Sequence, residues 1–243
     1  MPSTASHIAK VSPIVVVLVF SFLSCGKAFA APKPHVINFG KWTTVQWSPD
    51  SASAASDNSS MLKVRPLLVD ARIKEFTLGP VHDVTDRLFV VRRAFRVNDS
   101  LPQESAAPPH WQWQRGGWLL VDRLTGHISA INLPDFDAFY SAASWYRDYA
   151  AYCGISEDGK KIYAVVAQIS RRKPILKKAL DGGTNIGELK DATPDSACRV
   201  PAWQRAPARV TFDAGSTKQT FAVRGHTVDL VNDAEEEDGE ASK

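Results

Sequence analysis

Few residues in this 243-residue sequence could carry acid–base or metal chemistry. His82 precedes Asp86 by four residues, and Asp135 and Asp137 are separated by one residue. A hydrolase needs carboxylates, or a nucleophile with its base, that converge in a cleft, and a metal centre needs several ligands at suitable spacing. The sequence contains no Gly-x-Ser-x-Gly nucleophile elbow, no phosphate-binding loop, no His-Glu-x-x-His zinc motif and no dinucleotide-binding fingerprint. We hold these four residues as weak catalytic candidates, place His82 in a turn, and predict no cofactor and no metal.

An aromatic cluster offers a binding surface instead. Trp111, Trp113 and Arg115 alternate with glutamines, and alternate residues of a strand face the same side. Paired indoles beside a guanidinium suit stacking on sugar rings or on peptides, so these three residues are the predicted ligand-binding set. The alternative is that the indoles cover the core, which the usual burial of tryptophan favours. For the basic run at 171–178, we favour a solvated loop over an anion-binding patch.

Cys153 and Cys198 are predicted to pair. The sequence has three cysteines, of which Cys25 lies in the segment predicted below to be removed on export, so two remain. In an oxidising compartment an even number of cysteines indicates a disulfide, worth about 4 kcal/mol on the chain-entropy model. The alternatives are two buried thiols or a nucleophilic Cys153. The formal net charge of +3 is too small to indicate a nucleic-acid partner.

The first thirty residues have the pattern of an export signal. Lys10 precedes an apolar run at 14–23, and Ala28 and Ala30 form a small-x-small cleavage site. The run is shorter than the roughly twenty apolar residues of a membrane span, so we predict no transmembrane anchor. Lipidation at Cys25 is the minority alternative. The mature protein is therefore predicted to be periplasmic or extracellular.

The remaining chain is predicted to be one β domain at 31–231, followed by a disordered acidic tail. Residues 232–243 hold six acids and one lysine, and such a composition cannot bury enough apolar surface to fold.

Period-two alternation and β-branched runs predict strands along the domain. Glycine-containing turns at 122–126, 157–160 and 213–215 join several of them. One helical spacing, Phe136, Phe139, Tyr140 and Ala143 after a cap at Asp135, predicts a short helix or helical turn near 135–144. The predicted strands are at 43–47, 67–70, 75–78, 87–97, 118–122, 127–133, 146–155, 161–169, 208–212, 220–223 and 227–230.

Internal repetition suggests the architecture. The tetrapeptide Leu-Leu-Val-Asp at 67–70 recurs at 119–122, a shift close to the length of a four-stranded propeller blade. The segment 156–160, Ser-Glu-Asp-Gly-Lys, resembles the hairpin of TolB-type β-propellers, in which Asp-Gly makes the turn and an apolar strand follows. The resemblance implies an antiparallel all-β, propeller-like scaffold of about four small sheets. A β-sandwich is the runner-up.

For function, these features predict an exported, non-enzymatic binding module of the cell envelope or periplasm, with an envelope glycan or protein as partner. The first alternative is a secreted hydrolase of polysaccharide or peptide that uses His82, Asp135 or Asp137. The second is a structural or assembly factor of the envelope. Convergence of His82, Asp86, Asp135 and Asp137 in one cleft would favour the hydrolase, whereas their dispersal would favour binding or structure.

Overall fold

A computed structural model describes residues 33–47, 60–98, 100, 109, 111–180, 197–214 and 217–231. Contacts divide the chain into residues 1–33 and 34–243, and all described residues except Lys33 belong to the second unit. The predicted export segment at 1–30, with Cys25, and the acidic tail at 232–243 lie outside the described residues. The described residues form strands and turns without a helix.

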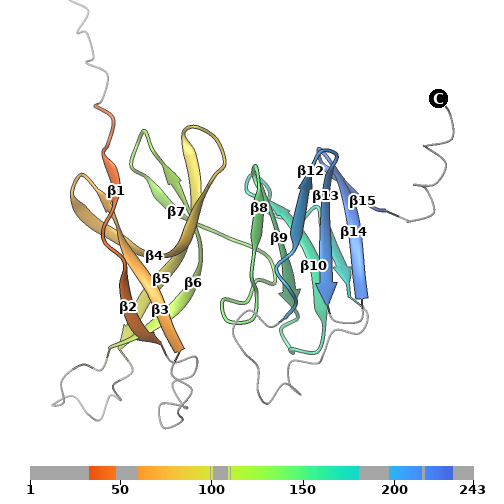
Figure 1. Cartoon of the computed structure of the whole chain (residues 1–243), viewed down its shortest axis with the longest axis horizontal. Helices are drawn as coiled ribbons and strands as arrows, with labels where there is room; N and C mark the ends of the chain where they lie inside the picture. The colour runs from red at the N-terminus through yellow and green to blue at the C-terminus, as the bar shows by residue number, and fades with distance from the viewer. Residues whose placement is uncertain are drawn as a thin grey trace, which may run out of the picture. The chain divides into compact units, whose positions relative to one another are not determined.

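The strands form three sheets (Figure 1), which we call sheets A, B and C. Among the described residues, every strand pairing is antiparallel except the one between β2 and β6, so the prediction of an antiparallel all-β fold is confirmed. Sheet A contains β1 (Ile37–Phe39), β2 (Thr43–Trp47), β3 (Ser60–Val69), β4 (Arg72–Asp83), β5 (Leu88–Asn98), β6 (Trp111–Asp122) and β7 (Ile128–Ile131). Sheet B contains β8 (Ser144–Tyr146), β9 (Tyr149–Ile155), β10 (Ile162–Gln168) and β11 (Leu176–Ala179). Sheet C contains β12 (Ala202–Arg205), β13 (Ala208–Ala214), β14 (Thr217–Arg224) and β15 (Thr227–Leu230).

Sheet A closes on itself. Its pairings run β2–β3, β3–β4, β4–β5 and β5–β6, and the parallel bridge between Trp47 and Trp113 returns from β6 to β2. The repeated tetrapeptides both lie in this sheet, at the ends of β3 and β6, and Leu67 and Leu119 share one buried cluster. The shift of 52 residues therefore does not separate two sheets, and a propeller arrangement stays a prediction.

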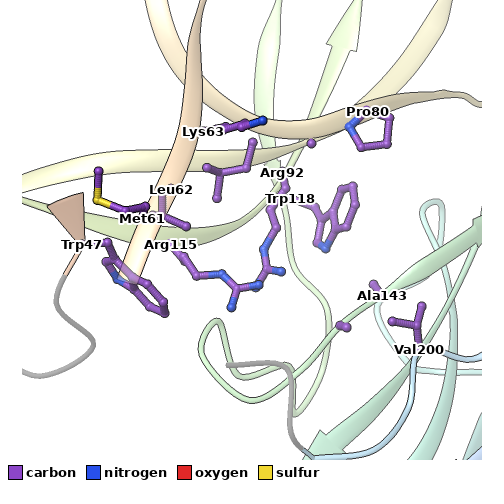
Figure 2. Close-up of a pocket in the computed structure, with 13 residues that line it drawn as sticks. Trp47, Met61, Leu62, Lys63, Pro80, Arg92, Arg115, Trp118, Ala143 and Val200 are labelled. Atoms are coloured by element: carbon purple, nitrogen blue, oxygen red, sulfur yellow. The ribbon is translucent and has the colours of Figure 1, made fainter. Parts of the chain in front are cut away.

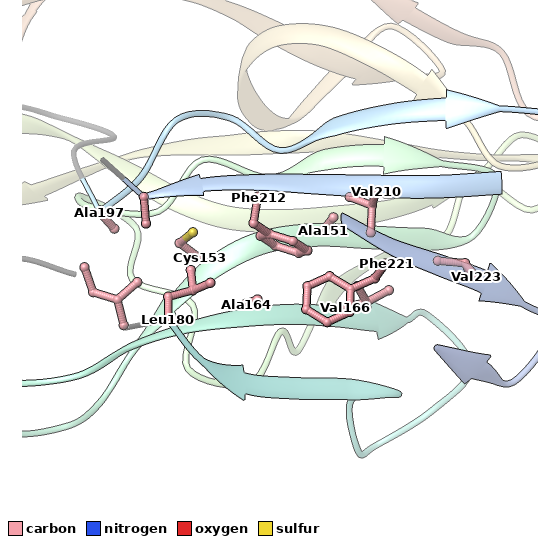
Figure 3. Close-up of a cluster of buried hydrophobic side chains, with 12 residues drawn as sticks. Ala151, Cys153, Ala164, Val166, Leu180, Ala197, Val210, Phe212, Phe221 and Val223 are labelled. Carbon is pink, nitrogen blue, oxygen red and sulfur yellow. The ribbon is translucent and has the colours of Figure 1, made fainter. Parts of the chain in front are cut away.

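Sheets B and C pack face to face, as two layers of a sandwich do. Phe212 and Phe221 of sheet C meet at 5.8 Å between ring centroids and pack on Ala164 and Val166 of sheet B (Figure 3). The opposite face of sheet B carries Tyr152, which packs with residues of sheet A. Because both faces are covered, β9 and β10 are buried almost continuously, and their sequences do not alternate.

The predicted disulfide is present. Cys153 on β9 and Cys198 are bonded, with 6.1 Å between their Cα atoms. Cys153 is buried in the core between sheets B and C, so the bond fastens the segment that enters sheet C to the centre of sheet B. A disulfide is typical of oxidising compartments and fits an exported protein.

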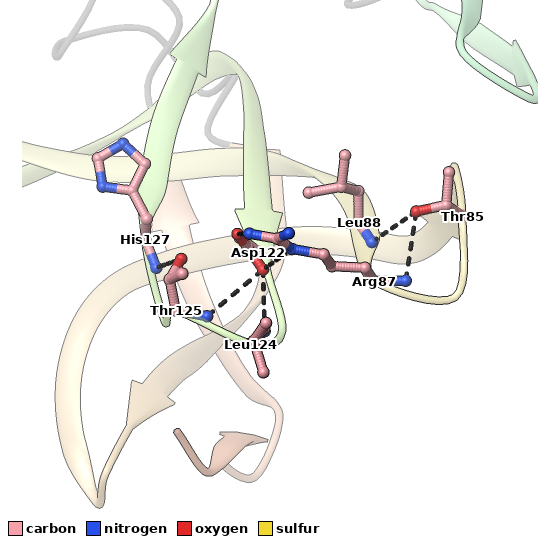
Figure 4. Close-up of polar contacts among 7 residues, drawn as sticks. All are labelled: Thr85, Arg87, Leu88, Asp122, Leu124, Thr125 and His127. Carbon is pink, nitrogen blue, oxygen red and sulfur yellow. Dashed lines mark hydrogen bonds and ion pairs between the residues drawn. The ribbon is translucent and has the colours of Figure 1, made fainter. Parts of the chain in front are cut away.

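The predicted turns at 122–126 and 157–160 join strands as expected, whereas the third predicted turn, at 213–215, extends outside the described residues. Between β6 and β7, Gly126 has a φ of +64°, and the Asp122 carboxylate accepts hydrogen bonds from the amides of Leu124 and Thr125 at 2.9 and 3.4 Å (Figure 4). Arg87 binds the same carboxylate through Nε at 2.8 Å and through Nη2. These hydrogen bonds hold the pKa of Asp122 well below its usual value.

The segment predicted as a short helix or helical turn forms turns with one helical bond, from the Ser141 amide to the Asp137 carbonyl at 2.9 Å. The residue predicted as its cap, Asp135, was the wrong choice. The carboxylate of Asp137 accepts from the amides of Phe139 and Tyr140 at 2.7 and 2.8 Å, whereas Asp135 has a φ of +56° and its carboxylate binds Lys177.

Candidate functional site

A pocket of about 550 Å³ opens at sheet A (Figure 2). Its walls come from five strands of sheet A, from the segment before β8 and from Val200, which lies two residues after Cys198. The lining residues are Trp47, Met61, Leu62, Lys63, Leu78, Gly79, Pro80, Arg92, Arg115, Trp118, Ala142, Ala143 and Val200.

A bulge on β6 brings two of these residues to one face. Residues three apart on a regular strand face opposite sides. The pairing of β5 with β6 shifts, however, so that Arg93 alone opposes Gly116 and Gly117, and the extra residue restores a common face for Arg115 and Trp118. A Cβ on Gly116 would lie 3.1 Å from the Cβ of Arg93, so a larger residue here would push Arg93 aside by a few tenths of an ångström.

A second irregularity shapes the opposite wall. The pairing of β4 with β5 shifts between Leu78 and His82, and Gly79 has a φ of +64°, which glycine adopts without strain. Leu78 is the last regularly paired residue before the shift, Gly79 and Pro80 leave the regular ladder, and all three line the pocket. Bulges often re-aim side chains beside functional sites, and this pocket lies between two of them.

Arg92 lies at the inner end of the pocket. It is 9% exposed, and its guanidinium donates to the carbonyls of Ala138 at 2.6 Å and of Gly116 and Ser141 at 3.4 Å. Arg115 is half-buried, and its guanidinium carbon lies 5.4 Å from the centroid of the Trp47 ring. Both guanidinium groups point into the space between Trp47 and Trp118 (Figure 2).

The wall facing sheet A is held by sheet B. The Ser141 hydroxyl donates to the Cys153 carbonyl at 2.7 Å and accepts from the Asp137 amide at 3.2 Å. Tyr152 donates its hydroxyl to the Pro134 carbonyl at 2.7 Å, and burial raises the pKa of this phenol well above its ordinary value. Neutral, satisfied groups therefore fix the backbone that presents Ala142 and Ala143.

The pocket is cationic, and its aromatic donors are unsatisfied. Its described lining residues include Lys63, Arg92 and Arg115 and no aspartate or glutamate. The indole N–H groups of Trp47 and Trp118 are buried and have no hydrogen-bond acceptor among the described residues. An unsatisfied buried donor costs free energy, but these two nitrogens have almost no exposed surface, so the cationic side chains are the groups that can meet a ligand. The arrangement can bind an anionic group between aromatic walls.

The three predicted binding residues do not lie together: one lines the pocket, and the other two lie beside Arg96. Arg115 lines the pocket. Trp113 packs edge-to-face on Phe76 at 5.0 Å over a small buried cluster, whereas Trp111 is 55% exposed. The guanidinium of Arg96 lies 5.7 and 5.5 Å from the ring centroids of Trp111 and Trp113, which places both indoles beside one cation, as their alternation on the strand predicts.

The four catalytic candidates do not line the pocket. His82 lies within β4, not in the predicted turn, and donates from Nε2 to the Arg147 carbonyl at 2.8 Å. Asp135 binds Lys177 at 2.8 Å and Asp137 caps a turn, while the Asp86 carbonyl accepts from Arg123 at 3.3 Å. Their described contacts stabilise turns and join segments.

Sequence reasoning missed Trp47, Arg92 and Trp118 as site residues. They come from β2, β5 and β6, and only the strand pairing brings them together. The adjacent glycines at 116 and 117 were the one sequence signal available, since a glycine pair inside a strand pattern suggests a bulge.

Within the described residues, no group of three or more His, Cys, Asp or Glu side chains is placed to hold a metal ion. The described part also contains no helix with the length and apolar character of a membrane span. No protein-family model, curated protein or solved structure matches the chain.

Proposed function

We propose that this protein is an exported, non-enzymatic binding module of the periplasm or cell envelope, and that its pocket takes an anionic ligand with a flat or apolar body. The observation that carries the proposal is the cationic lining of the pocket between two indole walls, without an acidic side chain among the described lining residues.

The chemistry of the ligand follows from the lining. Arginine suits carboxylate and phosphate groups because its planar fork donates two parallel hydrogen bonds. Trp47 and Trp118 line the pocket, and such aromatic side chains suit an apolar or ring-shaped body. A uronic acid, or an aromatic carboxylate of similar size, supplies both features. The predicted envelope glycan could therefore supply such a ligand.

The role in binding is also supported by rigidity. Arg92 is fixed by three backbone carbonyls, and the segment at 138–143 is fixed through Ser141 and the capping carboxylate of Asp137. A preorganised site loses little conformational entropy when it binds. The export pattern at 1–30 and the disulfide support a location outside the cytosol.

Isothermal titration with matched probes tests the proposal. We expect galacturonate to bind more tightly than galactose, and naphthoate more tightly than naphthalenemethanol. Replacing Arg115 with Gln removes a charged donor, and a hydrogen bond to a charged group contributes about 1.5–3 kcal/mol, so Arg115→Gln should weaken binding of the acid by at least about tenfold. The matched control is Arg96→Gln, which changes an exposed arginine beside Trp111 and should leave binding unchanged.

Equal affinity for the acid and the neutral probe of each pair would contradict the proposal. Loss of binding in Arg96→Gln but not in Arg115→Gln would instead assign the ligand to the exposed Trp111 surface.

A further inference from the structure

A second groove lies at the edge of sheet A, away from the residues of the ligand pocket. It has a volume of about 250 Å³ and is bounded on one side by β7 and on the other by the turn after β10. Its lining residues are Leu120, Ser129, Ala130, Ile131, Asn132, Ile169, Ser170, Arg171 and Arg172.

Strand β7 presents an open edge to this groove. In the described part of the chain β7 pairs with β6 alone. The Asp122 amide donates to the His127 carbonyl at 3.0 Å. Asp122 and His127 are therefore the first hydrogen-bonded pair of the ladder between β6 and β7. Such pairs alternate along an antiparallel ladder. The amide and carbonyl groups of Ile128 and Ala130 therefore point away from β6, and Ala130 is exposed.

The facing wall is basic and fixed. Arg171 and Arg172 are exposed, and the described lining of the groove includes no acidic side chain. The turn that carries them is held by the bond from the Arg171 amide to the Gln168 carbonyl at 2.9 Å and by the Gln168 side chain, which donates to Asp148 at 2.8 Å. Leu120, Ile131 and Ile169 pack on the buried cluster between sheets A and B and give the groove an apolar floor.

We propose that this groove docks an extended acidic segment of a partner protein, which adds to β7 as a further strand. Main-chain bonds to an open edge give affinity, and the side chains on alternate positions give specificity. Glutamate or aspartate at alternate positions of the segment faces Arg171 and Arg172, which is the charge complementarity that selects an acidic partner. The site is independent of the ligand pocket and of its proposed function.

Recognition of the segment by the open edge of β7 and recognition by the facing arginines can be tested separately, each with one variant. Ala130→Pro removes an outward-pointing amide and keeps the bonds between β6 and β7, since proline is tolerated where the N–H faces outward from an edge strand. Arg171→Glu with Arg172→Glu reverses the charge of the facing wall. Arg205→Glu, on an exposed arginine of β12 in sheet C, is the control with the same type of charge change.

The experiment uses the full mature protein and a short fluorescein-labelled peptide that alternates glutamate with valine, followed by fluorescence polarisation. We expect binding that weakens with added salt. Affinity should fall by at least about tenfold in the arginine reversal, because like charges then face each other, and should fall in Ala130→Pro, because one main-chain hydrogen bond at the sheet edge is lost. Binding should be unchanged in Arg205→Glu. The same peptide with lysine in place of glutamate should not bind.

Three results would overturn the proposal. The first is no binding of the glutamate peptide to the mature protein. The second is binding that neither Ala130→Pro nor the arginine reversals weaken. The third is binding that appears only after residues 232–243 are removed, because the occupant would then be the chain's own acidic tail. Circular dichroism and the thermal midpoint confirm that each variant is folded.

Discussion

Removing the bond between Cys153 and Cys198 should cost a large part of the stability of this protein. The two residues are 45 apart in the sequence, and the chain-entropy relation for a loop of this length gives about 4 kcal/mol. We therefore expect the double variant Cys153→Ala, Cys198→Ala to unfold with a free energy lower by about 4 kcal/mol. Cys153 is 1% exposed, so the space left by its sulfur adds a small further cost.

Urea unfolding measures this loss. The mature wild-type protein is compared with the double variant, and with wild type unfolded in the presence of a reductant. Both changes remove the same cross-link, so the two losses should agree apart from the small packing cost of the alanine variant. The denaturant slope should increase in both, because an unfolded chain without a cross-link exposes more surface. Val200 lines the ligand pocket and follows Cys198 by two residues, so affinity for acidic probes should also fall.

A loss below about 1 kcal/mol with an unchanged slope would refute the chain-entropy reasoning. Two free thiols on titration of the unreduced native protein would refute the bond itself. A double variant that loses stability while reduction of wild type has no effect would show that packing at Cys153, and not the cross-link, carries the stability.

Two further predictions follow from the same structure. Gly154→Ala should lower the free energy of unfolding by about 1–3 kcal/mol, because its Cβ would lie 2.9 Å from a methyl of Val165. Gly117→Ala, where a Cβ meets nothing within 4 Å, is the control, and equal losses in urea unfolding would contradict the packing argument. Arg87 holds the pKa of Asp122 below its ordinary value of 3.8, so this carboxylate contributes stability above about pH 4 that is lost as the pH falls further. The thermal midpoint of Asp122→Asn should therefore depend less on pH below about pH 4 than that of wild type, and parallel acid profiles would count against the contribution of this pair.

Most strands were predictable because their local pattern survives in the tertiary structure. The apolar runs at 161–169 and 208–212 became β10 and β13, and the Asp-Gly turn at 157–160 joins β9 to β10 through Gly159, whose φ is +69°. The Ser156 hydroxyl adds a bond to the Asp158 carboxylate at 2.6 Å. Such turns depend on residues within a few positions of one another, so sequence reasoning reaches them.

The sequence pattern missed β1, β11 and β12, and for β11 and β12 the pairing is supplied from elsewhere. β11 (Leu176–Ala179) is mostly exposed and carries two lysines, and β12 (Ala202–Arg205) contains a single large apolar residue, Trp203. Neither has the alternation that marks a strand. Each lies at the edge of its sheet and takes its conformation from the ladder of one neighbour.

The sequence alone determined the strands with a strong local pattern, their tight turns and the pairing of the two cysteines, because each depends on short-range geometry or on the parity of one residue type. Only the tertiary structure decided where the chemistry lies. Arg92 and Arg115 share a pocket because two ladders shift register and sheet A closes on itself, and register is set by contacts between strands distant in the sequence. Of the acidic residues that looked chemical in the sequence, Asp137 accepts backbone amides in a turn and Asp135 binds Lys177, and neither lines the pocket.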